Sequence, residues 1–394
     1  MAVQGVFGNP AKAVLGGGAV RGLPGRGFGG GPAPLGSGVE VPRGEGGGGF
    51  PPVQATCAGR LRWHRLAAPF ERPHLRLLRA AAVRRHAVDL APDAIIERYH
   101  NFGGEGMLAA ATVGAVAVLE VNAPVVDHPG SRKALLDRTL LVRPMQRWRE
   151  RLCGLADLLV TPSARILPPG VAPSRVLEVE WGADTDRFRP GARGPVPFER
   201  RPGETVVIFA GAFRAWHGAP LLAEAVAKLE RDGVCGVHAV FVGDGPERPR
   251  AEAAAASLGR VTFAGALPYD AMPACLAAAD IGVAPFDAAA HPPLQIDFYW
   301  SPLKVFEYMA AGLPVVAPRL PRLAALVEDG RDGLLYDPAR ADGLAEALRA
   351  LLGNPERRQA KGRAARAHVE RAYSWRAHFE QISPAITRLL PRQR

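Results

Sequence analysis

From residue 94 onward, short apolar runs alternate with longer segments that have a helical pattern. In the first half the runs fall at residues 94–96, 115–121, 158–161 and 176–179. Helical segments lie between them at residues 103–114 and 135–152. Apolar runs of this length between turn signals are typical of buried strands. The alternation predicts a parallel sheet with helices on both faces.

A second series of the same kind follows. Its strands are expected at residues 206–209, 239–242, 261–263 and 281–284. Its helices are expected at residues 220–231, 249–257, 271–279, 342–352, 356–372 and 374–389. Between the two series, residues 184–203 are rich in Pro, Gly and Arg and lack apolar periodicity, which is typical of a linker. The pattern therefore predicts two α/β domains.

Length and composition agree with two domains, and composition distinguishes an N-terminal segment from the rest of the chain. The chain of 394 residues has room for two cores, and 48% of its residues are hydrophobic. Residues 1–58 contain repeated Gly runs and few apolar clusters, so they are predicted to be disordered. The domain boundaries that follow are 59–190, 191–373 and a C-terminal helix in 374–394.

The charge of +11 indicates an anionic partner, either a phosphorylated substrate or acidic lipid headgroups. Nucleic acid is excluded as a partner because none of its usual recognition motifs is present. Biased codon usage in an Arg-rich chain is the competing explanation. Residues 60–85 are predicted to form a basic amphipathic helix. The preferred interpretation is the solvated face of a domain helix, and the alternative is a helix that lies on an anionic membrane surface. Four scattered cysteines and the absence of an evident signal peptide or bilayer-spanning run favour the cytoplasm, with peripheral membrane contact as an option.

The most informative segment is SPLKVFEYMAAGLPVVAP, at residues 301–318. Ser301 is a good N-cap, Gly312 supplies a left-handed stop, and residues 315–317 have the pattern of a buried strand. Amides at the helix start suit a phosphate, and Glu307 can accept hydrogen bonds from two hydroxyls of a ribose. Together they describe a nucleotide-sugar site. The alternative is that Lys304 and Glu307 form a plain surface pair.

This segment resembles the signature helix of the retaining family 4 glycosyltransferases, which have the GT-B fold. Glu307, followed by Met-Ala-Ala-Gly-Leu-Pro-Val-Val, matches the second acidic position of their motif. The first acidic position is occupied by Tyr299, and Asp297 is close enough to replace it, so both are assigned to the donor sugar. The resemblance implies two Rossmann-like domains with a cleft between them, and a last helix that crosses back to the first domain. The first domain is expected to be truncated, since residues 1–58 contain no strand, glycine loop and helix.

Further loops continue the resemblance. The segment FAGAFRAWHG at residues 209–218 resembles the first loop of the donor domain, although the alternative is a plain turn. Residues assigned to the donor diphosphate are Gly211, Arg214, His217, Ser301, Leu303 and Lys304. Residues assigned to the nucleobase loops are Gly243, Asp244, Phe263 and Gly265.

In the first domain, Glu97, Arg98 and Asn122 lie at the ends of predicted strands, where side chains face the cleft. They are the candidate catalytic residues; the alternative for Glu97 and Arg98 is an internal ion pair. The resemblance implies transfer of a glycosyl group from a nucleoside diphosphate sugar to a hydroxyl acceptor, with retention and without a metal or another cofactor. A polysaccharide, a lipid-linked sugar and a small molecule are the expected acceptor classes. A nucleotide-sugar epimerase and a non-catalytic nucleotide-sugar binding protein remain alternatives.

Overall fold

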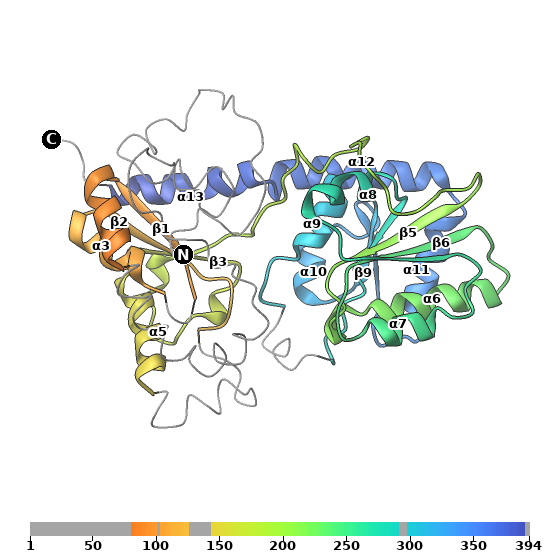
Figure 1. Cartoon of the computed structure of the whole chain (residues 1–394), viewed down its shortest axis with the longest axis horizontal. Helices are drawn as coiled ribbons and strands as arrows, with labels where there is room; N and C mark the ends of the chain where they lie inside the picture. The colour runs from red at the N-terminus through yellow and green to blue at the C-terminus, as the bar shows by residue number, and fades with distance from the viewer. Residues whose placement is uncertain (1–79, 101–102, 126–142, 291–297, 391–394) are drawn as a thin grey trace, which may run out of the picture.

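The structure is a computed structural model of the whole chain, and it describes residues 80–100, 103–125, 143–290 and 298–390. The expected disorder of residues 1–58, most of the basic segment and the position of Asp297 lie outside the described residues. Two lobes lie side by side along the long axis, each built around its own parallel sheet (Figure 1). The two predicted α/β series are therefore confirmed, while the exact domain boundaries stay predictions.

The N-terminal lobe contains a four-stranded parallel sheet in the order β1-β2-β3-β4. Its strands are β1 (Ala94–Arg98), β2 (Val116–Glu120), β3 (Leu158–Thr161) and β4 (Val176–Glu178). Helices α3 (Glu105–Val113) and α5 (Arg143–Leu155) pack on one face, and α13 (Trp375–Leu389) packs on the other. Strands β1, β2 and β3 are almost fully buried because helices cover both faces, whereas the edge strand β4 is partly exposed. Short 3-10 turns lie at Ala164–Ile166 and Pro173–Arg175.

The C-terminal lobe contains a six-stranded parallel sheet in the order β10-β9-β8-β5-β6-β7. Its strands are β5 (Thr205–Ala210), β6 (Val237–Val242), β7 (Val261–Gly265), β8 (Ile281–Val283), β9 (Val315–Pro318) and β10 (Gly333–Tyr336). One face is covered by α6 (Ala219–Arg231), α7 (Arg248–Ala254) and α11 (Gly343–Leu352). The other is covered by α8 (Met272–Ala277), α9 (Leu303–Ala310), α10 (Pro321–Leu326) and α12 (Pro355–Ala372). The strand order reverses between β5 and β8, and ligands bind at such switch points in open sheets.

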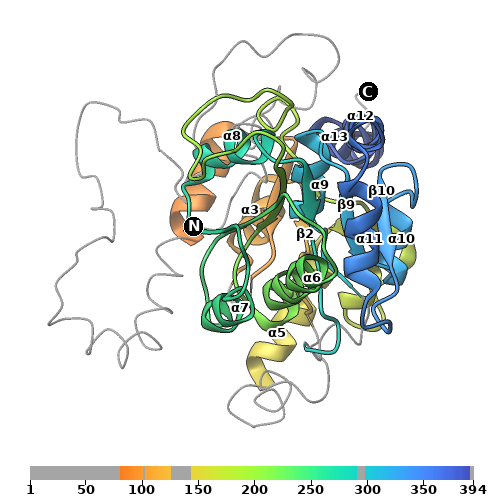
Figure 2. The same ribbon diagram turned by 90° about the vertical axis from the view of Figure 1, so that its right-hand side faces the viewer.

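Helix α12 lies along the C-terminal lobe and α13 along the N-terminal lobe, one after the other in Figure 1. Figure 2, seen along the long axis, shows the two helices overlapping at one edge of the molecule. Ile382, Ala385 and Ile386 of α13 enter the core of the N-terminal lobe, as the resemblance implied. At the crossing, the Ala183 amide donates to Tyr373 O at 2.8 Å, and the Trp375 amide donates to Ala183 O at 3.1 Å. The two chain segments that join the lobes are therefore bonded to each other.

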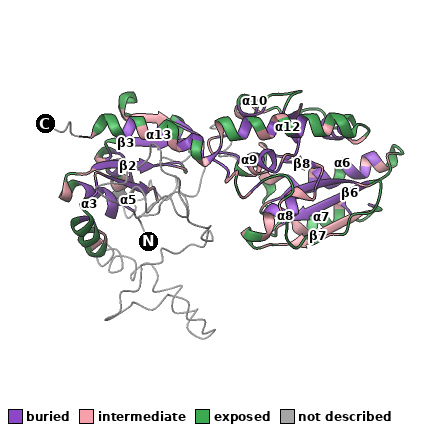
Figure 3. Cartoon of the chain, turned by 90° about the horizontal axis from the view of Figure 1, so that it is seen from above, coloured by how far each residue is buried: buried purple, intermediate pink, exposed green. Residues whose placement is uncertain are grey.

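Burial follows the sheets in both lobes, as Figure 3 shows. Helix α9 begins at Leu303, with Pro302 as N-cap, so the expected N-cap role of Ser301 is wrong. Gly312 does adopt the left-handed conformation, with a φ of 78°. Strand β10 and helix α10 had no counterpart in the predicted elements. Within the described segments, none of the helices combines the length and apolar character that crossing a bilayer requires.

Candidate functional site

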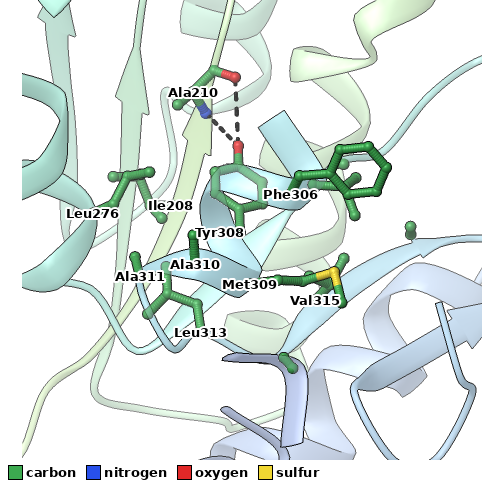
Figure 4. Close-up of a cluster of buried hydrophobic side chains, with 14 of the residues drawn as sticks. Ile208, Ala210, Leu276, Phe306, Tyr308, Met309, Ala310, Ala311, Leu313 and Val315 are labelled. Carbon is green, nitrogen blue, oxygen red and sulfur yellow. Dashed lines mark hydrogen bonds between the residues drawn. The ribbon is translucent and has the colours of Figure 1, made fainter. Parts of the chain in front are cut away.

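Tyr308 fixes helix α9 beneath the end of strand β5. Its hydroxyl accepts a hydrogen bond from the Ala210 amide at 2.7 Å and lies 3.4 Å from Ala210 O, as Figure 4 shows. The ring is fully buried and packs against Gly282, where an added Cβ would meet it at 2.5 Å. Because Ala210 directly precedes Gly211, this contact sets the distance between the helix and the first glycine loop.

Three glycines end neighbouring strands at the carboxyl edge of this sheet. The Gly211 amide donates to Val242 O at 2.9 Å, and the Gly243 amide donates to Gly265 O at 2.8 Å. A Cβ on Gly243 would lie 1.9 Å from Gly211 O, and all three glycines have positive φ. Only glycine permits this close approach of backbones, so the edge offers backbone rather than side chains to a ligand.

Lys304 points to this edge from the first turn of α9. An added Cβ on Gly211 would lie 2.7 Å from Lys304 Nζ and 3.7 Å from His217 Nδ1. The ammonium lies 4.5 Å from the Phe209 ring centre and 5.1 Å from that of Phe286. Its Nζ is buried and has no hydrogen-bond partner within the described parts of the chain. Burial lowers the pKa of Lys304 to about 7, and Glu307 opposes the shift.

Glu307 lies one turn further along α9, half-buried. The Tyr269 hydroxyl donates to its Oε1 at 3.2 Å. The Arg187 guanidinium stacks 4.7 Å from the Tyr269 ring centre and pairs with Asp270. Burial raises the pKa of Glu307 to about 7, against the Tyr269 hydrogen bond and the positive charges of Lys304 and Arg187. The acid is therefore held inside the site and does not point into solvent.

Ser301 connects the start of α9 to the other lobe. Its hydroxyl donates to Glu180 Oε2 at 2.5 Å and accepts from the Trp181 amide at 2.8 Å. Arg322 of α10 forms an ion pair with Glu180 and a hydrogen bond with Pro162 O. Burial raises the pKa of Glu180, and Arg322 opposes this. These contacts hold the segment after β4 against the C-terminal lobe.

The three candidate catalytic residues separate at the ends of β1 and β2. Glu97 is fully buried and accepts hydrogen bonds from the amides of Gly104 at 2.5 Å and Met107 at 2.9 Å, at the start of α3. Arg98 lies on the opposite face, 5.3 Å from the Trp181 ring centre, so the alternative of an ion pair with Glu97 is wrong. Asn122 follows β2 and is half-buried. No finding tests their catalytic roles, which stay predictions.

The remaining candidates take varied positions. Arg214 and Asp244 are exposed, and Leu303 is 40% exposed at the first position of α9. Phe263 lies within β7, where its ring stacks on Phe241 at 4.7 Å. Tyr299 packs against the core of the N-terminal lobe, across from the strand ends of the donor lobe.

Sequence reasoning missed Tyr308, Tyr269, Glu180 and Arg322. Tyr308 reads as one more apolar position of α9, and its partner Ala210 is 98 residues away. Glu180 and Arg322 are separated by 142 residues and carry no motif. One signal was available for Tyr269, since this aromatic hydroxyl comes four residues after Gly265 of the predicted nucleobase loop.

Comparisons with known proteins agree with this geometry. Residues 204–354 match the family described as glycosyl transferases group 1. The chain is 30% identical over 264 residues to sulfoquinovosyl transferase SQD2 of Arabidopsis thaliana, covering 62% of this chain and 48% of that protein. It is 26% identical to a GDP-mannose-dependent phosphatidylinositol monomannoside mannosyltransferase of Mycolicibacterium smegmatis, covering 74% and 80%. The chain spans about half the length of SQD2 and of the D-inositol 3-phosphate glycosyltransferases it matches.

Solved structures show the same fold. Sucrose-phosphate synthase of Thermosynechococcus elongatus superposes with a TM-score of 0.56 at 20% identity, covering 79% of this chain and 77% of that one. Anabaena HepE, solved with UDP and glucose, gives 0.56 at 18% identity, covering 78% and 81%. The two parallel sheets and these solved structures show that the chain has the GT-B fold, and residues 204–354 within it match the glycosyl transferases group 1 family.

Proposed function

We propose that the protein transfers a glycosyl group from a nucleoside diphosphate sugar to a hydroxyl of an acceptor, with retention and without a metal ion. The observation that carries the proposal is the buried Lys304 ammonium, which has no hydrogen-bond partner among the described residues. It lies beside Gly211 and His217 at the switch point of the sheet. A cation without a hydrogen-bonded partner in such a place suits a diphosphate.

The rest of the donor site extends from this point. Glu307 is one helical turn from Lys304, which places a carboxylate where the ribose of a bound nucleotide would lie. Gly211, Gly243 and Gly265 present backbone to the nucleotide. Negative charge that develops on the leaving diphosphate would be stabilised by Lys304 and His217, and one such donor is worth ~3 kcal/mol. Lobe closure about residues 184–203 would exclude water during transfer.

The acceptor belongs to the N-terminal lobe in this proposal. Asn122 and Arg98 lie at strand ends of that lobe, whereas Glu97 is fully buried and bonded to the start of α3. Two relatives act, by their names, on a phosphatidylinositol mannoside and on inositol 3-phosphate. The net charge of +11 suits an acceptor that carries a phosphate, whether lipid-linked or free, and peripheral contact with an anionic membrane. Sedimentation with anionic and neutral vesicles tests the membrane contact.

Donor identity and turnover can be measured separately. Thermal shift with UDP-, GDP- and ADP-sugars identifies the base, because a ligand that binds the folded state raises the unfolding temperature. Incubation of radiolabelled donor with and without acceptor extracts then follows transfer, and the anomeric configuration of the product reports retention. Unchanged turnover after EDTA treatment is expected, and a strict metal requirement would contradict the proposal.

A second candidate function is a non-catalytic nucleotide-sugar binding protein. Tyr299 favours it, because this residue stands at the family's first acidic position and packs against the N-terminal core. Donor binding without transfer to any acceptor would support that reading. Conversion of the labelled donor into an epimer without an acceptor would instead identify a nucleotide-sugar epimerase.

A further inference from the structure

A second group of ionisable side chains lies at the start of α3, in the N-terminal lobe. Glu97, His100 and Glu105 each offer one potential ligand atom, and these three atoms lie within 4.8 Å of one another. We call them the α3 cluster. Glu97 and Glu105 are 0% and 2% exposed, whereas His100 is half-buried and gives the cluster its route to solvent.

The two carboxylates of the α3 cluster differ in their hydrogen-bond partners. Glu97 accepts one amide hydrogen bond on each oxygen, from Gly104 and Met107. Both oxygens of Glu105 are buried and have no hydrogen-bond partner in the part of the chain that is described. A buried carboxylate without a partner is costly, and a second carboxylate beside it raises the cost further. A cation bound beside Glu105 would supply the partner that its oxygens lack.

Two glycines stand directly beside the ligand atoms of the α3 cluster. An added Cβ on Gly103 would lie 2.8 Å from Glu97 Oε1 and 3.0 Å from His100 Nε2. One on Gly106 would lie 3.0 Å from Glu97 Oε2. Glycine suits both positions, because a Cβ there would crowd the side chains of Glu97 and His100.

We propose that the α3 cluster binds a divalent transition-metal ion through Glu97, His100 and Glu105. One imidazole and two carboxylates are a ligand set that suits Zn²⁺ or Mn²⁺, whereas Mg²⁺ and Ca²⁺ prefer oxygen alone. The ion supplies the positive charge that Glu105 lacks and ties the first turn of α3 to the end of β1. The inference does not depend on the proposed transfer reaction.

The test uses the full chain, stripped with a chelator and then dialysed against Zn²⁺, Mn²⁺ or Mg²⁺. The wild-type protein is expected to retain about one Zn²⁺ or Mn²⁺ by elemental analysis and to unfold at a higher temperature with the ion bound. Glu105→Gln and His100→Ala are both expected to lose the ion and the temperature shift. His100 is half-buried, so its removal keeps the fold measurable if Glu105→Gln does not.

Another group of possible ligand residues, away from the α3 cluster, supplies a matched control; its members are Glu328, Asp332 and His368. In it, Asp332 Oδ2 already bonds His368 Nδ1 at 2.5 Å and accepts from the Glu328 amide at 3.0 Å. Glu328→Gln should therefore leave metal retention unchanged. The proposal is overturned if the ion is lost in Glu328→Gln and kept in Glu105→Gln. It is also overturned if the wild-type protein retains no ion.

Discussion

Replacement of Lys304 by Met should change stability and donor affinity in opposite directions. The lysine Nζ is buried without a hydrogen-bond partner among the described residues, and its pKa falls from 10.5 to about 7. A lysine needed only for the fold would have a hydrogen-bonded acidic partner there, whereas Glu307 acts on Lys304 only through its charge. A lysine kept for an anionic ligand destabilises the empty site until the ligand arrives.

The magnitude follows from the pKa shift. The fall of Lys304 from 10.5 to about 7 corresponds to roughly 5 kcal/mol at 1.36 kcal/mol per unit. The rings of Phe209 and Phe286 return ~2 kcal/mol or less through contact with the charged form. Methionine keeps most of the apolar stem, so Lys304→Met should raise the free energy of unfolding at pH 7 by about 1–3 kcal/mol.

The pH dependence has a definite sign. Between pH 7 and 10.5 the unfolded chain holds the Lys304 proton and the folded chain does not. The unfolded state therefore binds more protons, and this lysine makes wild-type stability rise with pH across that window. The methionine variant should lose this rise. Urea denaturation at pH 7 and pH 9 measures both effects.

Donor affinity should fall in the same variant. A hydrogen bond from a charged donor is worth about 1.5–3 kcal/mol, so the dissociation constant for UDP measured by calorimetry should increase roughly 10- to 150-fold. Lys228→Met, on the surface of α6, is the matched control and should change neither donor affinity nor the pH slope. A Lys304→Met protein that is less stable and binds UDP with unchanged affinity would refute the reasoning.

Four further outcomes are expected. Glu307→Ala should weaken donor binding in calorimetry by about 2–3 kcal/mol, because the ribose loses a charged acceptor. The pH profile of kcat/KM should be bell-shaped around pH 7, since donor binding needs Lys304 protonated and Glu307 ionised; a flat profile would exclude the pair. Glu180→Gln should lower kcat/KM while UDP affinity changes less, because it weakens the contact of Arg322 between lobes. Tyr308→Phe should lower the free energy of unfolding in urea by about 1–2 kcal/mol, and a neutral result would exclude the Ala210 hydrogen bond as a stabilising contact.

Local sequence pattern was sufficient for most of the fold. Strand β3 falls at residues 158–161 as predicted, because a buried apolar run between polar turns specifies a strand by itself. Gly312 takes the left-handed stop for an equally local reason. Strand β10 was missed because its four residues lie at the edge of the sheet, where a short run has little pattern to detect.

Local sequence pattern was insufficient for polar side chains that can bond either a neighbour in the sequence or a distant group. Ser301 has the residue type of an N-cap, yet its hydroxyl bonds Glu180, which is 121 residues away. Glu97 stands at a strand end, as a cleft residue would, yet α3 amides occupy it. Each outcome depends on which distant group the fold brings near, and the sequence around the residue does not contain that information.

The segment around α9 is held by both lobes, which links donor binding to lobe position. Tyr299 packs against the core of the N-terminal lobe. Two residues later in the chain, the Ser301 hydroxyl donates a hydrogen bond to Glu180. From the other side, Tyr308 fixes the same helix to the end of β5. Lys304 and Glu307 lie between these anchors, so any rotation of the lobes changes the strain on the helix that carries both. A nucleotide that binds these two residues therefore binds best at one lobe arrangement, and its binding free energy can drive closure over an acceptor.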